Sequence, residues 1–274
     1  MRSLPQTSAL ALALVAAAPI SAAPVPFAGL PTDYSYVELA KMALAARVVI
    51  AADIADAIAL KGEAAAGVPA GTRRYYVQAD VRGLISGAAV PARVTYLVDL
   101  PDDAAGKKLK LKGVPVLLLA TPGTTAGELR LIGPRAQIPR TTDNERKLRA
   151  ILTEAVAADA PPAITGITRA FHVAGTLPGE GETQIFLKTA DQRPISLSIL
   201  RRPNEQPRWA VALSEMVDDS AAPPKPDTLL WYRLACGLPR ALPESAVSSL
   251  NPEDATAAKA DYQLVLTGLG PCGG

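Results

Sequence analysis

Regular alternation of apolar and polar residues constrains the fold of this chain more than any other feature. In residues 73–85, Tyr75 and Val77 fall on one side of an extended chain, and Tyr76 and Gln78 fall on the other. A period of two is typical of a β-strand that has one face on a core and the other in solvent. The same pattern returns in residues 167–213. We therefore expect an α+β protein that is mostly antiparallel β and has two β units in succession.

Residues 23–135 are expected to form the first unit. Its strands are predicted at residues 48–60, 73–85, 94–98, 114–120 and 129–131. No helical stretch separates them, so the five strands should pair antiparallel. Such a unit is an OB-like barrel or a sandwich.

A connecting helix and a four-stranded meander are predicted in residues 136–222. The helix begins near Thr142 or Asp143 and ends at Pro161. In the first meander strand, Phe171 and Val173 share the apolar face, which leaves His172 on the opposite face. The apolar face of this meander must be covered by another layer.

The cover is expected from residues 223–274, which contain two predicted helices. One is capped by Asp227 and runs through Cys236, and the other starts at Asn251. Cys236 and Cys272 are the only cysteines. In an oxidising compartment such a pair is predicted to form a structural disulfide. A redox-active pair is the alternative, but it favours a C-x-x-C spacing, which is absent.

The first 22 residues have the layout of a secretory signal peptide. Arg2 is followed by the unbroken apolar run 9–18 and then by the small residues Ser21 and Ala22. Ten apolar residues cannot cross a hydrocarbon core of about 30 Å, which disfavours a membrane anchor. We expect cleavage after Ala22, a periplasmic or secreted protein, and no transmembrane segment in the mature chain.

Composition excludes several classes of function. The formal net charge is +2 and aromatic residues make up 4% of the chain, so the electrostatic and stacking features of nucleic-acid binding are missing. No Walker or dinucleotide-binding motif occurs. With one histidine and two cysteines that are expected to be bonded, we predict no metal site and no cofactor.

Candidate catalytic residues are few. His172 is the only histidine, and the loop 175–182 brings Glu180 and Glu182 close to it in sequence. Carboxylates beside a histidine are typical of acid–base hydrolysis. The alternative is a hairpin loop whose glutamates remain in solvent, and we favour that interpretation.

A basic strip, defined as Lys107, Lys108, Lys110 and Lys112, alternates with Leu109 and Leu111. Lysines in this pattern protect the edge strand of a sheet from edge-to-edge pairing. They also suit an anionic surface such as lipid phosphates or wall polymer. The first interpretation is favoured, and the second remains open.

Three motifs carry a resemblance to a known group of proteins. They are GTLPGEGETQIFL from Gly175, RWAVALSEMVD from Arg208 and LLWYRLACGLP from Leu229. The chain resembles exported, uncharacterised proteins of sphingomonad-type alphaproteobacteria. The resemblance implies an address in the cell envelope and no activity, cofactor or catalytic residue.

Two functions from different classes follow. The first is a non-catalytic binding or protein-interaction module of the cell envelope, whose partner is an envelope protein or an anionic envelope surface. The second is an envelope hydrolase that uses His172, Glu180 and Glu182 at the meander loop. Since the sequence contains no nucleophile, metal or nucleotide motif, we expect the first.

Overall fold

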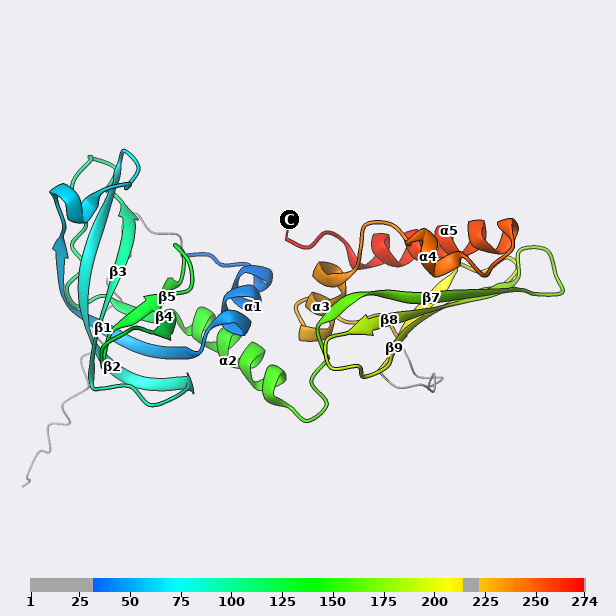
Figure 1. Ribbon diagram of the computed structural model, residues 1–274, viewed down its shortest axis with the longest axis horizontal. Helices are drawn as coiled ribbons and strands as arrows, with labels where there is room; N and C mark the ends of the chain where they lie inside the picture. The colour runs from blue at the N-terminus through cyan, green and yellow to red at the C-terminus, as the bar shows by residue number, and fades with distance from the viewer. Residues whose placement is uncertain (1–31, 214–221, 274) are drawn as a thin grey trace, which may run out of the picture.

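The computed structural model describes residues 32–213 and 222–273. Two β-sheet lobes follow one another along the chain, and helices lie between them (Figure 1). The architecture is α+β with antiparallel sheets, as the sequence predicts. The predicted signal peptide, residues 1–22, lies outside the described residues.

The first lobe contains one six-stranded sheet and two helices that pack on it. All five predicted strands are present, and the structure adds a short sixth strand, β6, which pairs with β4. The elements are α1 (Tyr36–Ala45), β1 (Val48–Ala59), the 3₁₀ turn η1 (Gly62–Ala65), β2 (Thr72–Gly87), β3 (Arg93–Pro101), β4 (Pro115–Pro122), β5 (Leu129–Leu131), β6 (Gln137–Pro139) and α2 (Thr142–Val156).

The strand order in this sheet is β3-β2-β1-β4-β5. The two outer strands, β3 and β5, approach each other at one isolated parallel bridge between Thr95 and Glu128. No further pairing of β3 with β5 occurs among the described residues. The sheet is thus strongly curled and is joined across its edges at a single point.

The first half of β1 and most of β4 are buried on both faces. Alternate residues of β1, such as Val48 and Ile50, face the interior of the curled sheet. Val49 and Ala51 instead face a second apolar layer that is formed with α1 and α2. This double burial explains the nearly continuous apolar sequence of β4, because neither of its faces meets water.

Local capping sets where the first two helices begin. Ser35 caps α1, and its hydroxyl forms a capping box with Glu38. Thr141 caps α2 by accepting a hydrogen bond from the backbone of Asn144. Helix α2 therefore starts within two residues of its predicted position.

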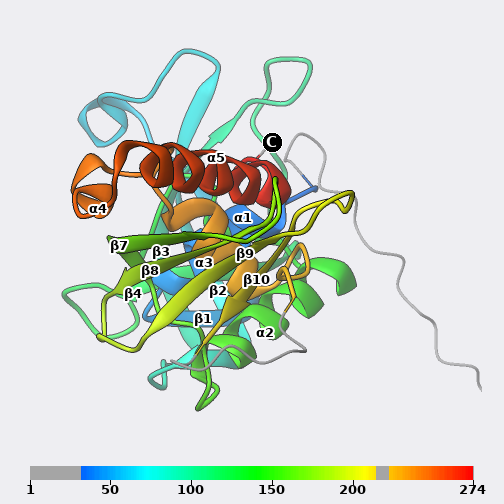
Figure 2. The same ribbon diagram turned by 90° about the vertical axis from the view of Figure 1, so that its right-hand side faces the viewer.

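The second lobe is the predicted four-stranded meander with a helical cover. The strand order is β10-β9-β8-β7, and α5 lies across one face of the sheet (Figure 2). The short helix α4 was not predicted from the sequence. The elements are β7 (Ile164–Ala174), β8 (Gly181–Thr189), β9 (Ile195–Arg201), β10 (Arg208–Ala212), α3 (Leu229–Gly237), α4 (Glu244–Val247) and α5 (Pro252–Leu269).

One expectation about the meander is wrong, namely which face of β7 is covered. Ala170 is fully buried and the His172 side chain is nearly so, while Phe171 and Val173 are 40% and 68% exposed. Ile167 still packs partly against the core, and the register shift between Ile167 and Arg169 causes the reversal after it. A β-bulge adds one residue, so the alternation changes phase at that point of the strand.

The C-terminal helices are fixed to the sheet by apolar packing and by the predicted disulfide. Cys236 at the end of α3 is bonded to Cys272 after α5, with Cα atoms 4.9 Å apart. Thr228, not Asp227, caps α3, and Asn251 caps α5 as predicted. At Gly268 a Cβ atom would lie 2.7 Å from the indole nitrogen of Trp209, so only glycine allows α5 this close to the sheet.

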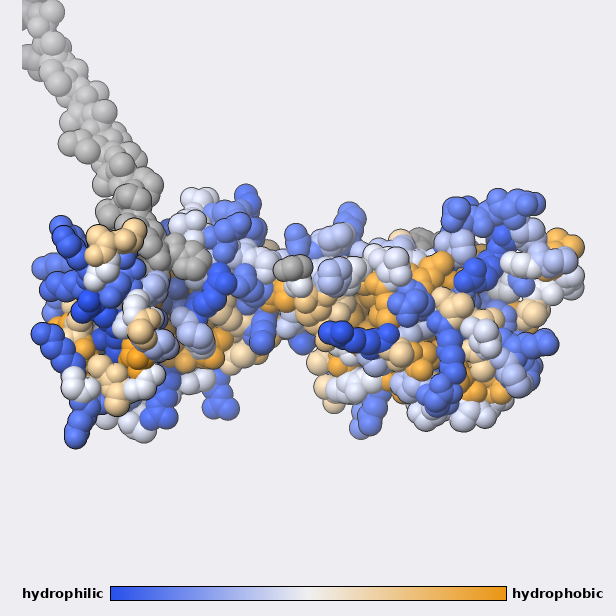
Figure 3. Space-filling view, turned by 90° about the horizontal axis from the view of Figure 1, so that it is seen from above, coloured by the Kyte–Doolittle hydropathy of each residue, from blue (hydrophilic) through white to orange (hydrophobic). Residues whose placement is uncertain are grey.

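A narrow waist separates the lobes (Figure 3). Across it, the rings of Tyr36 and Trp231 meet edge to face with centroids 6.4 Å apart. The Glu154 carboxylate accepts a hydrogen bond of 2.7 Å from the backbone nitrogen of Leu229. Within residues 32–213 and 222–273, no helix is long and apolar enough to span a membrane.

Candidate functional site

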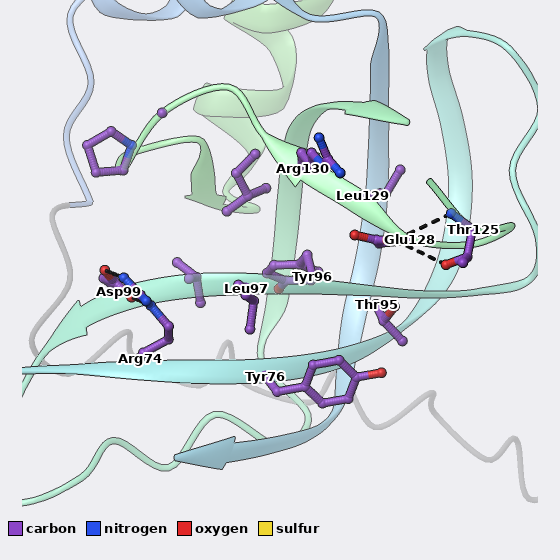
Figure 4. A pocket seen from close by; sticks show the side chains of 14 residues that line it. Arg74, Tyr76, Thr95, Tyr96, Leu97, Asp99, Thr125, Glu128, Leu129 and Arg130 are labelled. Carbon is purple, nitrogen blue, oxygen red and sulfur yellow. Dashed lines mark hydrogen bonds and ion pairs between the residues drawn. The ribbon is translucent and has the colours of Figure 1, made fainter. Parts of the chain in front are cut away.

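A hollow lies on the first lobe where the curled sheet stays open, between β3 and β5 (Figure 4). Its volume is about 670 Å³, which falls in the range of small-ligand sites. Consecutive residues of both strands line it, together with the outer side of β2 and the β4–β5 loop. The lining residues are Arg74, Tyr76, Thr95, Tyr96, Leu97, Val98, Asp99, Thr125, Glu128, Leu129, Arg130, Leu131, Gly133 and Pro134.

The hollow narrows at one end and widens at the other. Thr95 and Glu128 lie side by side at the bridge, where the Thr95 N–H donates to the Gly127 carbonyl at 2.8 Å. Farther along the two strands, Asp99 and Arg130 lie well apart (Figure 4). The site is therefore a wedge between two strand edges that run in the same direction.

One wall of the wedge carries an apolar pair beside an ion pair. Tyr76 and Leu97 face each other across β2 and β3, and Leu97 is 51% exposed. Next to them the Arg74 guanidinium binds both carboxylate oxygens of Asp99, with each hydrogen bond 2.8 Å long. This hydrogen bonding lowers the pKa of Asp99 below its usual range. The wall therefore offers apolar contact and two fixed charges of opposite sign.

The narrow end is ordered by Glu128. Its Oε2 accepts hydrogen bonds from the hydroxyls of Thr124 and Thr125, each 3.1 Å long. Hydrogen bonds from Thr125 and then Thr124 lower the pKa of this carboxyl group. Arg130 is exposed and makes no ion pair or side-chain hydrogen bond within the described part of the chain. A bound molecule thus meets a fixed acceptor and a free cationic donor here.

Tyr96 closes the inner side of the hollow. Its hydroxyl donates to Gln137 Oε1 on β6 at 2.6 Å, and burial raises the pKa of the phenol far above its ordinary value. Tyr96 is therefore a neutral hydrogen-bond donor with a fixed direction. It anchors the wall, and it is not an acid–base group.

The sequence carries one signal for this site. Tyr76 and Leu97 are large apolar residues on the outward faces of strands, where polar residues are expected. The pairing of β2 with β3 that brings them together was not apparent from either residue alone.

His172 lies in the second lobe, away from this hollow, in a buried polar network. Its Nδ1 is 2.8 Å from the Thr183 hydroxyl, which donates to the buried Asp261 carboxylate on α5. Because that hydroxyl has a single proton, already given to Asp261, Nδ1 of His172 is the donor in its contact with Thr183. Arg201 also binds Asp261. The network joins β7, β8 and β9 to α5.

Glu180 and Glu182 do not join His172 in this network. Oε2 of Glu180 accepts hydrogen bonds from the backbone nitrogens of Thr176 and Leu177, at 3.1 and 3.3 Å, and so holds its own turn. Glu182 is exposed and lies on the sheet face opposite Thr183. The structure therefore places the three candidate catalytic residues in three different settings.

The basic strip occupies a loop, and the expected edge strand is not found there. Leu111 is buried and Leu109 is partly buried against the core, while all four lysines are exposed. The Leu109 N–H donates to the Tyr75 hydroxyl at 3.0 Å, which a sheet ladder would not allow. Among the described residues none of these lysines forms an ion pair. The four are Lys107, Lys108, Lys110 and Lys112.

In the described parts of the chain, no group of three or more histidine, cysteine, aspartate or glutamate side chains could hold a metal ion. Comparison with known proteins adds no family assignment: no family model matches the chain, and no curated protein matches it.

Proposed function

We propose that this protein is a non-catalytic binding or interaction module of the cell envelope and that its ligand occupies the hollow between β3 and β5. The observation behind this proposal is the open wedge. Two strand edges, an apolar pair and four charged groups line its volume of about 670 Å³. The outer face of strands 2 and 3 and the loop between strands 4 and 5 are the common ligand-binding parts of OB-type barrels. The cell-envelope address rests on the predicted signal peptide and on the resemblance to exported proteins.

The charges in this hollow support binding rather than catalysis. Arg74 is committed to Asp99, and Glu128 is committed to two threonines. Groups held in this way can fix the orientation of a ligand, but neither carboxylate is poised to exchange a proton near neutral pH, because both pKa values are lowered.

Site-specific photo-crosslinking in intact cell envelopes tests this proposal. A photoreactive amino acid replaces Leu97, which is 51% exposed in the hollow, and in a matched control it replaces Leu84, which is 45% exposed elsewhere on β2. We expect a discrete adduct from position 97 only. The same adducts from both positions, or none from either, would contradict the proposal.

The basic strip supports a second candidate, association with an anionic envelope surface. Four exposed lysines that lack ion-pair partners among the described residues lie along one loop, and two leucines hold that loop to the core. Positive charges near an anionic bilayer contribute about 1 kcal/mol each, and salt screens that attraction.

Vesicle binding tests this candidate. The full mature chain is mixed with vesicles that contain phosphatidylglycerol, and the triple variant Lys107→Gln, Lys108→Gln, Lys110→Gln is compared with Lys41→Gln, Lys188→Gln, Lys225→Gln. Both variants lose the same charge, but only the first loses three of the four lysines of the strip. We expect salt-sensitive binding that only the first variant loses, and equal loss in both variants, or no binding, would reject the candidate.

A further inference from the structure

We propose that the hollow between β3 and β5 receives an extended, uncharged polypeptide segment of a partner protein, which is added to the sheet as a strand. This inference rests on the proposed binding function and names the class of its ligand. Strand addition of this kind uses main-chain hydrogen bonds for affinity and alternate side chains for specificity.

The edge of β3 supplies the first row of main-chain groups. The Thr95 N–H points away from β2, since it donates to Gly127 at 2.8 Å. Every second residue of a strand directs its backbone groups to the same side, so Leu97 and Asp99 direct theirs into the wedge. The ladder between β3 and β5 ends at Thr95, within the described residues, which leaves these positions facing the hollow.

The edge of β5 supplies the second row. On its far side, the Glu128 carbonyl accepts from Gly123 at 2.7 Å and the Ile132 N–H donates to Leu119 at 3.1 Å. Those contacts use the β4 side, so by the same alternation Leu129 and Leu131 direct their backbone groups toward the wedge. Two rows of amide and carbonyl groups therefore flank one opening.

The direction and the length of the opening suit a single strand. Because β3 and β5 run parallel at their bridge, a segment that enters between them in the opposite direction pairs antiparallel with both. From Leu97 to Pro101, β3 extends roughly 14 Å at about 3.4 Å per residue, which fits a segment of about five residues.

Side chains around the opening define which segment fits. Arg74 with Asp99, and Glu128 with Arg130, give the lining no net charge, so a segment that carries a net charge gains no net electrostatic attraction from the lining as a whole. Tyr76 and Leu97 offer an apolar platform to every second side chain of the segment. We therefore expect the bound segment to be uncharged and to place at least one aliphatic residue over Tyr76 and Leu97.

The test starts from the adduct formed at position 97. Mass spectrometry identifies the crosslinked segment, which is then synthesised as a peptide of seven residues and titrated against the full mature chain. The decisive variant is Leu97→Pro, because proline removes an N–H that faces the wedge and leaves the hydrogen bonds to β2 in place. Leu97→Ala is the matched control, since it removes the same side chain and keeps the N–H.

We expect Leu97→Pro to bind the peptide about tenfold more weakly than Leu97→Ala does. Circular dichroism checks that both variants are folded. A second measurement needs no variant of the protein: N-methylation of every second backbone nitrogen of the peptide should weaken binding in either phase, because one set of N–H groups bonds to β3 and the other set to β5.

Each other result overturns the inference. If the position 97 adduct is a glycan or a lipid, the strand proposal fails while the binding function stands. Equal affinity of the proline and alanine variants, or unweakened binding of a peptide that is N-methylated in either phase, also contradicts strand addition. Absence of any adduct specific to position 97 contradicts the binding function itself.

Discussion

In the first lobe, arginine–aspartate pairs lie across neighbouring strands at the surface. In the second lobe, the carboxylate of Asp261 is buried, with only 1% of its side chain exposed, and it binds Arg201 and Thr183. The surface pairs of the first lobe are Arg73–Asp102, Arg74–Asp99, Arg82–Asp53 and Arg93–Asp80.

This difference shows that charged groups have different roles in the two antiparallel sheets. A buried charge needs hydrogen-bond partners inside the protein. The polar groups around Asp261 therefore join the second sheet to α5. Surface pairs cost little to form or to rearrange. The first lobe can therefore keep charged groups beside an open hollow, where a ligand reaches them.

Removing the disulfide, which lies in the second lobe, should have the largest effect on stability. For Cys236→Ser with Cys272→Ser, we expect the free energy of unfolding to fall by roughly 3–4 kcal/mol, because the unfolded chain is no longer closed over 36 residues. Urea unfolding is followed by the fluorescence of Trp209 and Trp231, both in the second lobe. An unchanged free energy of unfolding in the double variant would contradict this prediction.

Replacing Asp261 should have the next largest effect. In Asp261→Ala we expect a loss of about 3 kcal/mol, because Arg201 and the buried Thr183 lose their partner. The value lies at the low end for buried pairs, since one third of the Arg201 side chain is exposed. Tryptophan-detected urea unfolding measures it, and Asp261→Asn, which keeps the shape, should recover part of the loss. Unchanged stability in Asp261→Ala would show that the network is not a structural staple.

A change at the waist tests whether the lobes unfold independently. Trp231→Ala removes the edge contact with Tyr36 and the indole hydrogen bond to the Leu269 carbonyl. We expect a loss of about 2 kcal/mol, less than for a fully buried aromatic residue, and a single calorimetric transition that separates into two. Phe171→Ala, on the open face of the second sheet, is the control and should leave the transition single.

The smallest effect is expected at the surface pair of Arg74 and Asp99. The pKa of Asp99 is lowered by Arg74, so the pair stabilises the fold above the unfolded pKa of about 3.9 and loses this contribution as the pH falls through the folded value. Asp99→Asn should therefore cost only a small fraction of the loss in Asp261→Ala at pH 7, and the difference from wild type should vanish in acid. Thermal unfolding between pH 7 and pH 2 measures it. A difference that grows on acidification would contradict this assignment.

Much of the fold follows from local patterns in the sequence. The alternation in β2 and β3 and the proline and acidic residues after Asn251 placed strands and a helix correctly, because the signals are local. The short strand β6 was missed, since its three residues owe their extended form to pairing with β4. The covered face of β7 was assigned wrongly because bulges leave no clear mark in the sequence.

The candidate site was less accessible from the sequence. His172, Glu180 and Glu182 are neighbours along the chain, yet each has a different surrounding, because bulges and turns decide where a side chain of a hairpin points. In contrast, Asp99 and Arg130 are far apart in sequence and line one hollow. Their proximity depends on how the sheet curls, and no local pattern records that curvature.

The sequence by itself determined the antiparallel class, the order of the two β units and the pairing of the two cysteines. The first two features depend on side-chain periodicity, and the third depends on the presence of only two cysteines. Only the tertiary structure decided that β3 and β5 meet at one bridge and then diverge, and that Asp261 is buried against the second sheet. The physical reason is that strand edges and buried charges find their partners through contacts between residues distant in the chain.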